Sequence, residues 1–177
     1  QVWALDASTG LAAWHLQADE HPAAMITGTP AFHNGRLYVG VSSFEEVRAV
    51  TPGYVCCNFR GSVQAVDAAT GKVLWKTAIG RDGGNYKGPR CTPAQDNGKV
   101  YALGQHGDLV CINGKDGKIV WKKDLVKDFG GMAGGWNYTE SPLIDGDKLI
   151  CTPGGRTSTV VALSKTNGKQ LWHCPIG

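Results

Sequence analysis

The sequence predicts an all-β protein built from repeated four-stranded antiparallel sheets. Three observations predict this class. A motif of alternating apolar residues, a polar residue, a glycine and a tryptophan occurs four times in 177 residues. A second pattern, in which a proline precedes a short strand and a tight turn, lies upstream of three of these motifs. The 25 glycines fall at turn positions and not in a low-complexity tract.

Each copy of the first motif predicts a hairpin. Its apolar run alternates as a strand does, and Asp6 or Asp67 can then accept backbone N–H bonds in an Asx-type turn. Asn113 keeps an acceptor at this position, and Ser164 keeps a weaker one. A glycine four residues before the tryptophan supplies the positive φ of a short hairpin loop. The four tryptophans are Trp14, Trp75, Trp121 and Trp172.

The second pattern predicts another hairpin before each of the last three motifs. Its turns are Asn34-Gly35, Asn97-Gly98 and Asp145-Gly146, which favour two-residue hairpin loops. Two hairpins in series give four antiparallel strands, which is the blade of a β-propeller. We therefore expect one incomplete propeller domain over residues 1–177, which missing blades or a partner chain would complete. Its expected parts are a half blade at 1–17 and blades at about 28–78, 90–125 and 140–175.

The long loops of this propeller fragment should all lie at one end. Strand direction alternates within a blade, so loops after the second and fourth strands lie opposite the short Asp-x-x-Thr-Gly turns. These loops are the insertion 42–60 and the connections "GRDGGNYKGPR" and "VKDFGGMAGGWNYTE". Long loops on one side of a rigid scaffold are where binding usually takes place, so function is expected there.

Composition excludes several classes of protein. The net charge of +3 is too small to indicate nucleic-acid binding, and no run of about 18 apolar residues predicts a membrane span. The six cysteines form no C-x-x-C, the local signature of zinc ribbons and thioredoxin-like sites. The chain begins at Gln1, inside a motif, so we expect a piece of a longer protein.

Cys56 and Cys57 are adjacent in the longest insertion. Consecutive Cα atoms lie about 3.8 Å apart, whereas ordinary disulfides prefer roughly 4.4–6.8 Å. A bond between these two cysteines would therefore be strained, and such strain tends to persist at functional sites. A flat sulfur surface would suit a flat aromatic ligand; two reduced thiols are an equally good reading of the residues.

The repeated A-x-D-x-x-T-G-K-x-x-W pattern resembles the tryptophan-docking motif of quinoprotein propellers, which use pyrroloquinoline quinone (PQQ). In that family each tryptophan packs onto the turn of the next blade. The segment Ser42–Thr77 resembles polyvinyl-alcohol dehydrogenases and related PQQ-dependent alcohol dehydrogenases. From about Tyr86 the sequence is similar to non-catalytic PQQ-like repeat proteins, relatives of a scaffold for outer-membrane protein assembly.

The resemblance implies a cofactor site. Cys56 and Cys57 would form a vicinal disulfide over one face of PQQ, and Arg60 would bind one of its carboxylates, which a guanidinium suits well. Trp136, in a glycine-rich loop outside the repeat, is the candidate for stacking on the other face; packing at a blade edge is the alternative. Glu45 and Glu46 could ligate a calcium ion, because hard cations prefer carboxylate oxygens, or could simply be solvated.

The leading functional expectation is part of a periplasmic or secreted PQQ-dependent alcohol dehydrogenase. It would act on an alcohol substrate and pass electrons to an acceptor such as a cytochrome c. The alternatives are a non-catalytic scaffold for protein binding or outer-membrane assembly, and a truncated product without activity. The catalytic base stays unassigned: Asp82 and Asp128 are available, whereas Asp96 lies in a turn at the wrong end.

Other polar residues are weaker candidates. His15 and His173 follow motif tryptophans and should lie on the surface. His106 and Asp108 belong to a short loop at the functional end, where a turn role is favoured over ligand binding. The remaining cysteines lie on or beside strands, where small buried thiols are common, and their spacing leaves any disulfide pairing open. They are Cys91, Cys111, Cys151 and Cys174.

Overall fold

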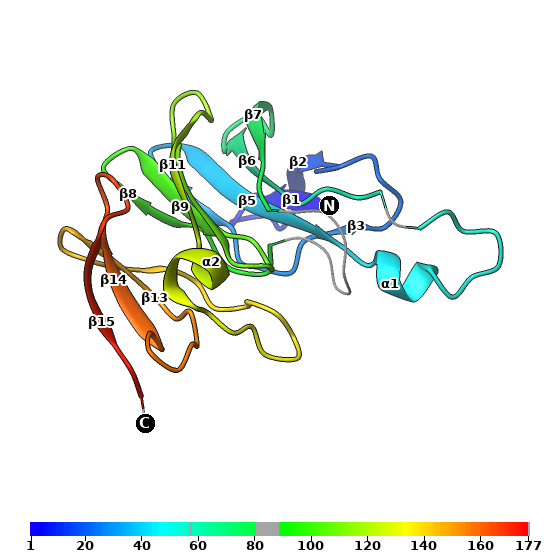
Figure 1. The fold of residues 1–177 in the computed structure, drawn as a ribbon. Helices are drawn as coiled ribbons and strands as arrows, with labels where there is room; N and C mark the ends of the chain where they lie inside the picture. Colours follow the sequence, from blue (N-terminus) through cyan, green and yellow to red (C-terminus); the bar gives the residue numbers. More distant parts are fainter. Residues whose placement is uncertain (57, 81–88, 177) are drawn as a thin grey trace.

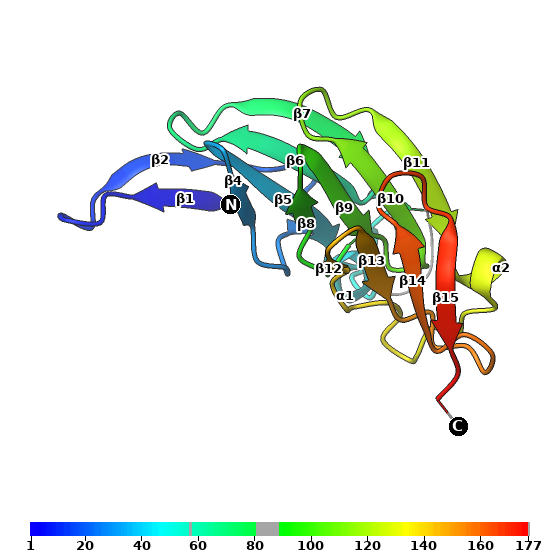
Figure 2. The same ribbon diagram turned by 90° about the vertical axis from the view of Figure 1, so that its left-hand side faces the viewer.

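The computed structural model describes residues 1–56, 58–80 and 89–176. This part of the chain is mostly antiparallel sheet, divided among four sheets. Figure 2 shows the sheets following one another in chain order along an arc. Each sheet presents its face to the next one, so the predicted propeller-type architecture of three and a half blades is confirmed.

The first two sheets form the N-terminal half of the arc. The first is a hairpin of β1 (Val2–Leu5) and β2 (Ala12–Leu16), which is the half blade. The second runs β4 (Ala31–His33), β5 (Arg36–Ser43), β6 (Ser62–Asp67) and β7 (Val73–Ala78). The short strand β3 (Ala24–Met25), which the sequence did not predict, pairs with the far end of β5.

The third and fourth sheets each have four strands in chain order. The third consists of β8 (Ala94–Asp96), β9 (Lys99–Leu103), β10 (Asp108–Asn113) and β11 (Ile119–Asp124). The fourth consists of β12 (Leu143–Asp145), β13 (Lys148–Cys151), β14 (Val160–Ser164) and β15 (Gln170–Cys174). Their sequential antiparallel pairing is the blade topology that two hairpins in series predict.

The polar residue of each repeated motif organises its turn as expected. Asp67 Oδ1 accepts hydrogen bonds from the amides of Ala69 (3.1 Å) and Thr70 (2.8 Å). Gly71 follows with φ of 73°, a conformation that costs a residue with a Cβ atom but not glycine. The turn therefore closes through contacts local in sequence, which is why the motif could be recognised.

Indole rings join neighbouring sheets. Trp14 Nε1 donates to the carbonyl of Ala68 (3.0 Å), and Trp121 Nε1 donates to that of Lys165 (2.9 Å). Each acceptor lies in the motif turn of the following blade. The three apolar clusters likewise lie between consecutive sheets and not within any single one. Blade-to-blade packing therefore supplies the core.

Two short helices lie in segments for which the sequence predicted irregular structure. α1 (Glu45–Arg48) begins the insertion after β5, and α2 (Leu125–Phe129) follows β11. Asp124 caps α2, because its Oδ1 accepts the amides of Val126 and Lys127 at 3.0 Å each. Gly130, with φ of 64°, ends the helix. The capping signals were present, but five residues are too few for a helical period.

One predicted turn is displaced by a residue. Asp145 pairs with Lys148, so the loop between β12 and β13 consists of residues 146 and 147 and not of Asp145-Gly146. Gly146 has φ of 57° and stands first in the loop, where the type II′ hairpin turn favours glycine. The other two predicted turns hold: Asn34 and Asn97 have φ of 47° and 46°.

In the parts of the chain described, no helix has the length and apolar character needed to cross a membrane.

Candidate functional site

The long loops gather at the end of the sheets away from the motif turns. Figure 1 shows α1, α2 and their loops on the lower side of the sheets, while the β6–β7 and β10–β11 turns lie at the top. Strand pairing requires this placement, since α1 follows a second strand and α2 follows a fourth. The predicted separation of a short-turn end from a long-loop end is therefore found in the structure.

Glu45 accepts hydrogen bonds from several residues of the insertion. Its side chain is fully buried (0% exposed). Its Oε1 accepts hydrogen bonds from the Tyr54 hydroxyl and the Asn58 amide, both at 3.1 Å. Its Oε2 accepts the Phe59 amide at 2.9 Å. Burial, together with the bond to Glu45, raises the pKa of Tyr54 above its ordinary value. The carboxylate thus connects the start of the insertion to the limb that returns towards β6, which carries Tyr54, Asn58 and Phe59.

The residues expected to face a cofactor lie on this limb. Cys56 and Arg60 are exposed, and the Arg60 guanidinium donates to the carbonyl of Phe59 at 3.1 Å. Cys56 is one partner of a disulfide. Cys57 lies outside the described residues, so the vicinal pairing stays a prediction. The side chain of Glu46 is also outside the described part of the structure.

Trp136 lies on a separate loop, between α2 and β12. Its indole is 67% exposed, while the backbone around it is held in place. Arg90 donates to the Trp136 carbonyl at 2.8 Å. The buried Tyr138 donates its amide to Gln105 (3.0 Å) and its hydroxyl to the carbonyl of Pro153 (2.8 Å), and burial raises its pKa to about 12. An exposed aromatic ring is therefore presented by a fixed backbone.

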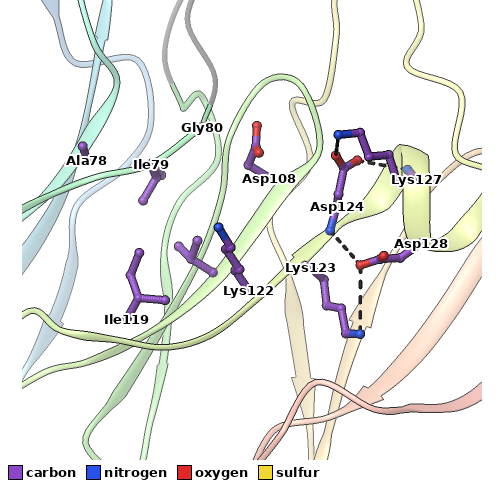
Figure 3. A pocket seen from close by; sticks show the side chains of 11 residues that line it. Ala78, Ile79, Gly80, Asp108, Ile119, Lys122, Lys123, Asp124, Lys127 and Asp128 are labelled. Atoms are coloured by element: carbon purple, nitrogen blue, oxygen red, sulfur yellow. Dashed lines mark hydrogen bonds and ion pairs between the residues drawn. The ribbon is translucent and has the colours of Figure 1, made fainter.

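A cavity of about 680 Å³ lies between the second and third sheets. Figure 3 shows charged side chains of both signs around it, among them Asp108, Lys122 and Asp128. Asp128 accepts the Asp124 amide (3.0 Å) and lies 4.0 Å from Lys123 Nζ. Of the aspartates considered as a catalytic base, Asp128 thus stands at the long-loop end, and Asp82 lies outside the described residues. Asp96 pairs with Lys165 at the turn end.

The weaker candidates are located as follows. His15 and His173 are exposed on outer strands, as expected. His106 contacts Gln105 in the short loop between β9 and β10. Of the four cysteines on or beside strands, which are free thiols, three are buried as expected. Cys174 is exposed on β15, contrary to expectation, because that strand has no following sheet against it in this chain.

The fit of a calcium ion depends on the carboxylates. Glu45 turns both oxygens to donors of its own loop. Across residues 1–56, 58–80 and 89–176 there is no group of three or more histidine, cysteine, aspartate or glutamate side chains that could hold a metal ion. The described residues alone therefore do not form a calcium site, and the ligand roles of Glu45 and Glu46 remain predictions.

Sequence reasoning missed the residues that anchor these loops. His21 contacts Asn58 of the insertion across 37 residues, and Arg90 holds Trp136 across 46. Tyr54 donates to Glu45 within the insertion itself. Nothing in their local sequence marks them. The available signal was Glu45 itself, a carboxylate two residues after the buried strand β5.

The sheets, the docked tryptophans and the loop-bearing end match a known family. The sequence profile of the family described as "Outer membrane protein assembly factor BamB", which consists of PQQ-like repeats, matches residues 60–175. The chain belongs to the BamB-like PQQ repeat family. This confirms the resemblance to PQQ-type propeller repeats that the motif indicated.

Proteins with two different names are similar in sequence to this PQQ repeat chain. A "Polyvinylalcohol dehydrogenase" of Sphingopyxis sp. (strain 113P3) is 48% identical over 97% of the chain. BamB of Salmonella typhimurium is 30% identical over 63% of it. The chain spans 26% of the length of each of these two relatives. The dehydrogenase similarity thus extends well beyond Ser42–Thr77, into the half that also resembles the assembly factor.

Solved structures agree on the fold. The crystal structure of BamB from Moraxella catarrhalis superposes with a TM-score of 0.64 at 18% identity. The match covers 97% of this chain and 42% of that one. At this identity the likeness establishes the propeller fold of the PQQ repeats and nothing about activity.

Proposed function

We propose that this chain is part of a PQQ-dependent alcohol dehydrogenase similar to polyvinyl-alcohol dehydrogenase. One observation carries the proposal: 48% identity to such an enzyme along 97% of the chain. That span includes both loops on which Cys56, Arg60 and Trp136 are placed. We further propose that residues 1–177 form one propeller domain that the remaining blades complete.

The described residues suit a planar, anionic quinone. Arg60 is exposed on the insertion, and its planar fork of donors matches a carboxylate in a bidentate manner. The exposed indole of Trp136 on its fixed loop suits stacking against a flat ring system. Cys56, on the same limb as Arg60, belongs to the predicted sulfur surface on the other face. These residues would bind and orient PQQ, and the blades would exclude water around it.

PQQ, when bound, takes two electrons and two protons from the alcohol, which leaves as a carbonyl compound. A calcium ion would assist this chemistry, as the resemblance to PQQ-dependent dehydrogenases implies. Its ligands would come in part from blades beyond this chain. The base that accepts the hydroxyl proton is likewise expected there. The electron acceptor is expected to be a protein such as a cytochrome c, and the location periplasmic or secreted.

A non-catalytic scaffold for protein binding is the second candidate. The profile match to the assembly factor over residues 60–175 favours it, because this region holds two complete blades. Under this function the exposed residues of the long loops, including Trp136, would contact a partner protein without a cofactor.

Reconstitution distinguishes the two functions. The full-length protein containing this chain is incubated with PQQ and calcium, desalted, and measured for retained quinone absorbance. Oxidation of a polymeric secondary alcohol is then followed with an artificial electron-accepting dye. The dehydrogenase function predicts stoichiometric quinone and dye reduction that depends on it. A protein that retains no quinone after desalting would overturn the proposal and leave the scaffold.

A further inference from the structure

We infer that Glu45 is a positioning residue: its buried carboxylate fixes the limb of the insertion that carries Tyr54, Asn58 and Phe59, and so sets how tightly the chain binds an anionic planar quinone. The link to the quinone rests on the proposed function, whereas the anchoring does not. Glu45 would act through the Tyr54 hydroxyl and two backbone amides, which donate to its carboxylate. This positioning role is an alternative to the calcium ligation that the resemblance implies for Glu45.

Three hydrogen bonds among the described residues form the anchor. β5 ends at Ser43, and Glu45 begins α1 two residues later. The carboxylate then reaches residues 9, 13 and 14 positions ahead, where the Tyr54 hydroxyl and the amides of Asn58 and Phe59 donate to it. Charge-assisted bonds of this kind are stronger than neutral ones. Asn58 and Phe59 lie between Cys56 and Arg60, so the anchor acts where the candidate ligand-binding side chains emerge.

His21 joins the same cluster from outside the insertion. Its Nδ1 accepts the Ala23 amide at 3.2 Å, which leaves Nε2 as the donor. Nε2 lies 2.9 Å from Asn58 Oδ1 and 3.5 Å from Glu45 Oε1. The ring also packs edge-on against Phe59, with centroids 5.4 Å apart. The limb is thus held both by the insertion itself and by the connection from the half blade.

The cluster is tied to the rigid sheets. The His21 amide donates to Asp19, whose carboxylate pairs with Lys76 on β7. The buried Phe59 packs in the apolar cluster with Val39 and Val66 of β5 and β6. An anchor on packed strands holds its loop more precisely than one between mobile loops.

The anchor leaves the outer side of the insertion exposed. Val50 and Val55 are 82% and 81% exposed, and Cys56 and Arg60 are also exposed. One side of the segment is therefore fixed through Glu45, while the other is presented outward. Removing the carboxylate would take this acceptor from the buried Phe59 amide and from the part-buried Asn58 amide, so the limb is expected to loosen without disturbing the sheets.

The test compares Glu45→Ala and Glu45→Gln with Glu140→Gln. Glu140 is a matched control, because it too accepts a hydroxyl bond (Thr152, 2.7 Å) and an amide bond (Thr139, 3.2 Å) in a loop of another blade. Backbone hydrogen exchange is measured on the full-length protein without quinone or calcium. We expect the amides of residues 58 and 59 to exchange at least about 10-fold faster in Glu45→Ala than in wild type. The increase should be smaller in Glu45→Gln, and the exchange rate should be unchanged in Glu140→Gln.

Tyr54→Phe is included in case Glu45→Ala does not fold, because it removes only one hydrogen-bond donor to Glu45. It should speed exchange at the same two amides by about 2- to 5-fold while amides of β5 and β6 keep their protection. Unchanged exchange at residues 58 and 59 in both Glu45→Ala and Tyr54→Phe would overturn the anchoring. If Glu45 were a calcium ligand, these exchange rates would be unchanged and the calcium affinity of Glu45→Ala would change.

Quinone titration provides the second readout. Glu45→Ala should weaken PQQ binding about 10-fold although Arg60 is intact. If exchange rises but PQQ affinity is unchanged, the positioning of ligand-binding side chains is refuted. If the wild-type protein binds no PQQ while exchange still rises in the variants, the proposed function fails and the anchor stands.

Discussion

The indole nitrogen of Trp75 donates to the carbonyl oxygen of Gly114, 3.0 Å away in the next sheet. Three residues further on, Gly117 provides the surface on which the ring lies: a Cβ there would approach the indole to 2.8 Å. Trp14 with Gly71 and Trp121 with Gly168 repeat the arrangement, at 2.8 and 2.9 Å. The same glycine therefore closes a turn within one blade and receives the tryptophan of the preceding blade.

The docking of Trp14 can be tested at its glycine. Gly71→Ala should destabilise the protein by about 1–3 kcal/mol more than Gly10→Ala. Both glycines have positive φ (73° and 71°), so both variants carry the same backbone penalty. They differ in that a Cβ at Gly71 meets the Trp14 ring, whereas one at Gly10 meets nothing within 4 Å. Urea unfolding of the two variants measures the difference, and equal losses would contradict indole docking.

Acid should weaken the motif turns. The Thr70 hydroxyl bond to Asp67 lowers the pKa of that carboxyl below its ordinary 3.8, and the equivalent bonds, led by that from the Ser8 hydroxyl, lower the pKa of Asp6 to about 2. Because the folded pKa is depressed, the stabilisation is present above pH 3.8 and is lost as pH falls towards 2.

The variant Asp67→Asn should therefore be less stable than wild type at pH 6 and lose less stability between pH 4 and 2. The free energy of unfolding, measured across this range, checks it. Asp147→Asn, at an exposed hairpin position, should follow the wild-type curve. A steep acid loss that is identical in Asp67→Asn and wild type would assign the effect to other carboxyls.

Alkali should weaken the packing between the third and fourth sheets. Burial raises the pKa of the Cys91 thiol from its ordinary 9.0 to about 11 and that of Cys151 to about 12. For these raised values the stabilisation is complete below pH 9 and is lost as pH rises towards 11 and 12. Cys91 alone accounts for about 2–3 kcal/mol at the end of its range.

Unfolding measured from pH 8 to 11 should show a smaller alkaline loss in Cys91→Ala than in wild type. Cys174→Ala serves as the control, because that thiol is exposed. Thiol alkylation gives an independent check at pH 8: Cys174 should react in the native protein, and Cys91 and Cys151 only after unfolding. Rapid native labelling of Cys91 would show that it is not buried.

Quinone affinity should depend on Trp136 and Arg60. If the proposed function holds, Trp136→Ala should weaken PQQ binding about 10-fold through lost stacking. Arg60→Lys should weaken it about 5- to 10-fold, since lysine keeps the charge but loses the bidentate fork. Trp3→Ala is the control, because Trp3 is also exposed (54%) but stacks on His15 in the half blade. Equal affinity in all three variants would place the cofactor elsewhere.

Most of the scaffold could be predicted from the sequence because its determinants are local. The bond from the Thr70 amide to Asp67 spans three residues, and the Asn34-Gly35 turn joins strands that are adjacent in the chain. Alternation, turn residues and the tryptophan of each motif recur in register, so the blades and their order followed. Short local signals, such as the caps of α2, were too brief to be recognised.

The candidate site is different, because its geometry depends on contacts between distant segments. Glu45 meets Phe59 across 14 residues, and Arg90 holds the Trp136 loop across 46. The sequence alone determined which loops are long and at which end of the sheets they lie, since strand alternation leaves no choice. Only the tertiary structure decided that Glu45 turns inward while Arg60 and Trp136 stay exposed. A side chain's burial depends on what the rest of the fold places beside it, and no local pattern encodes that.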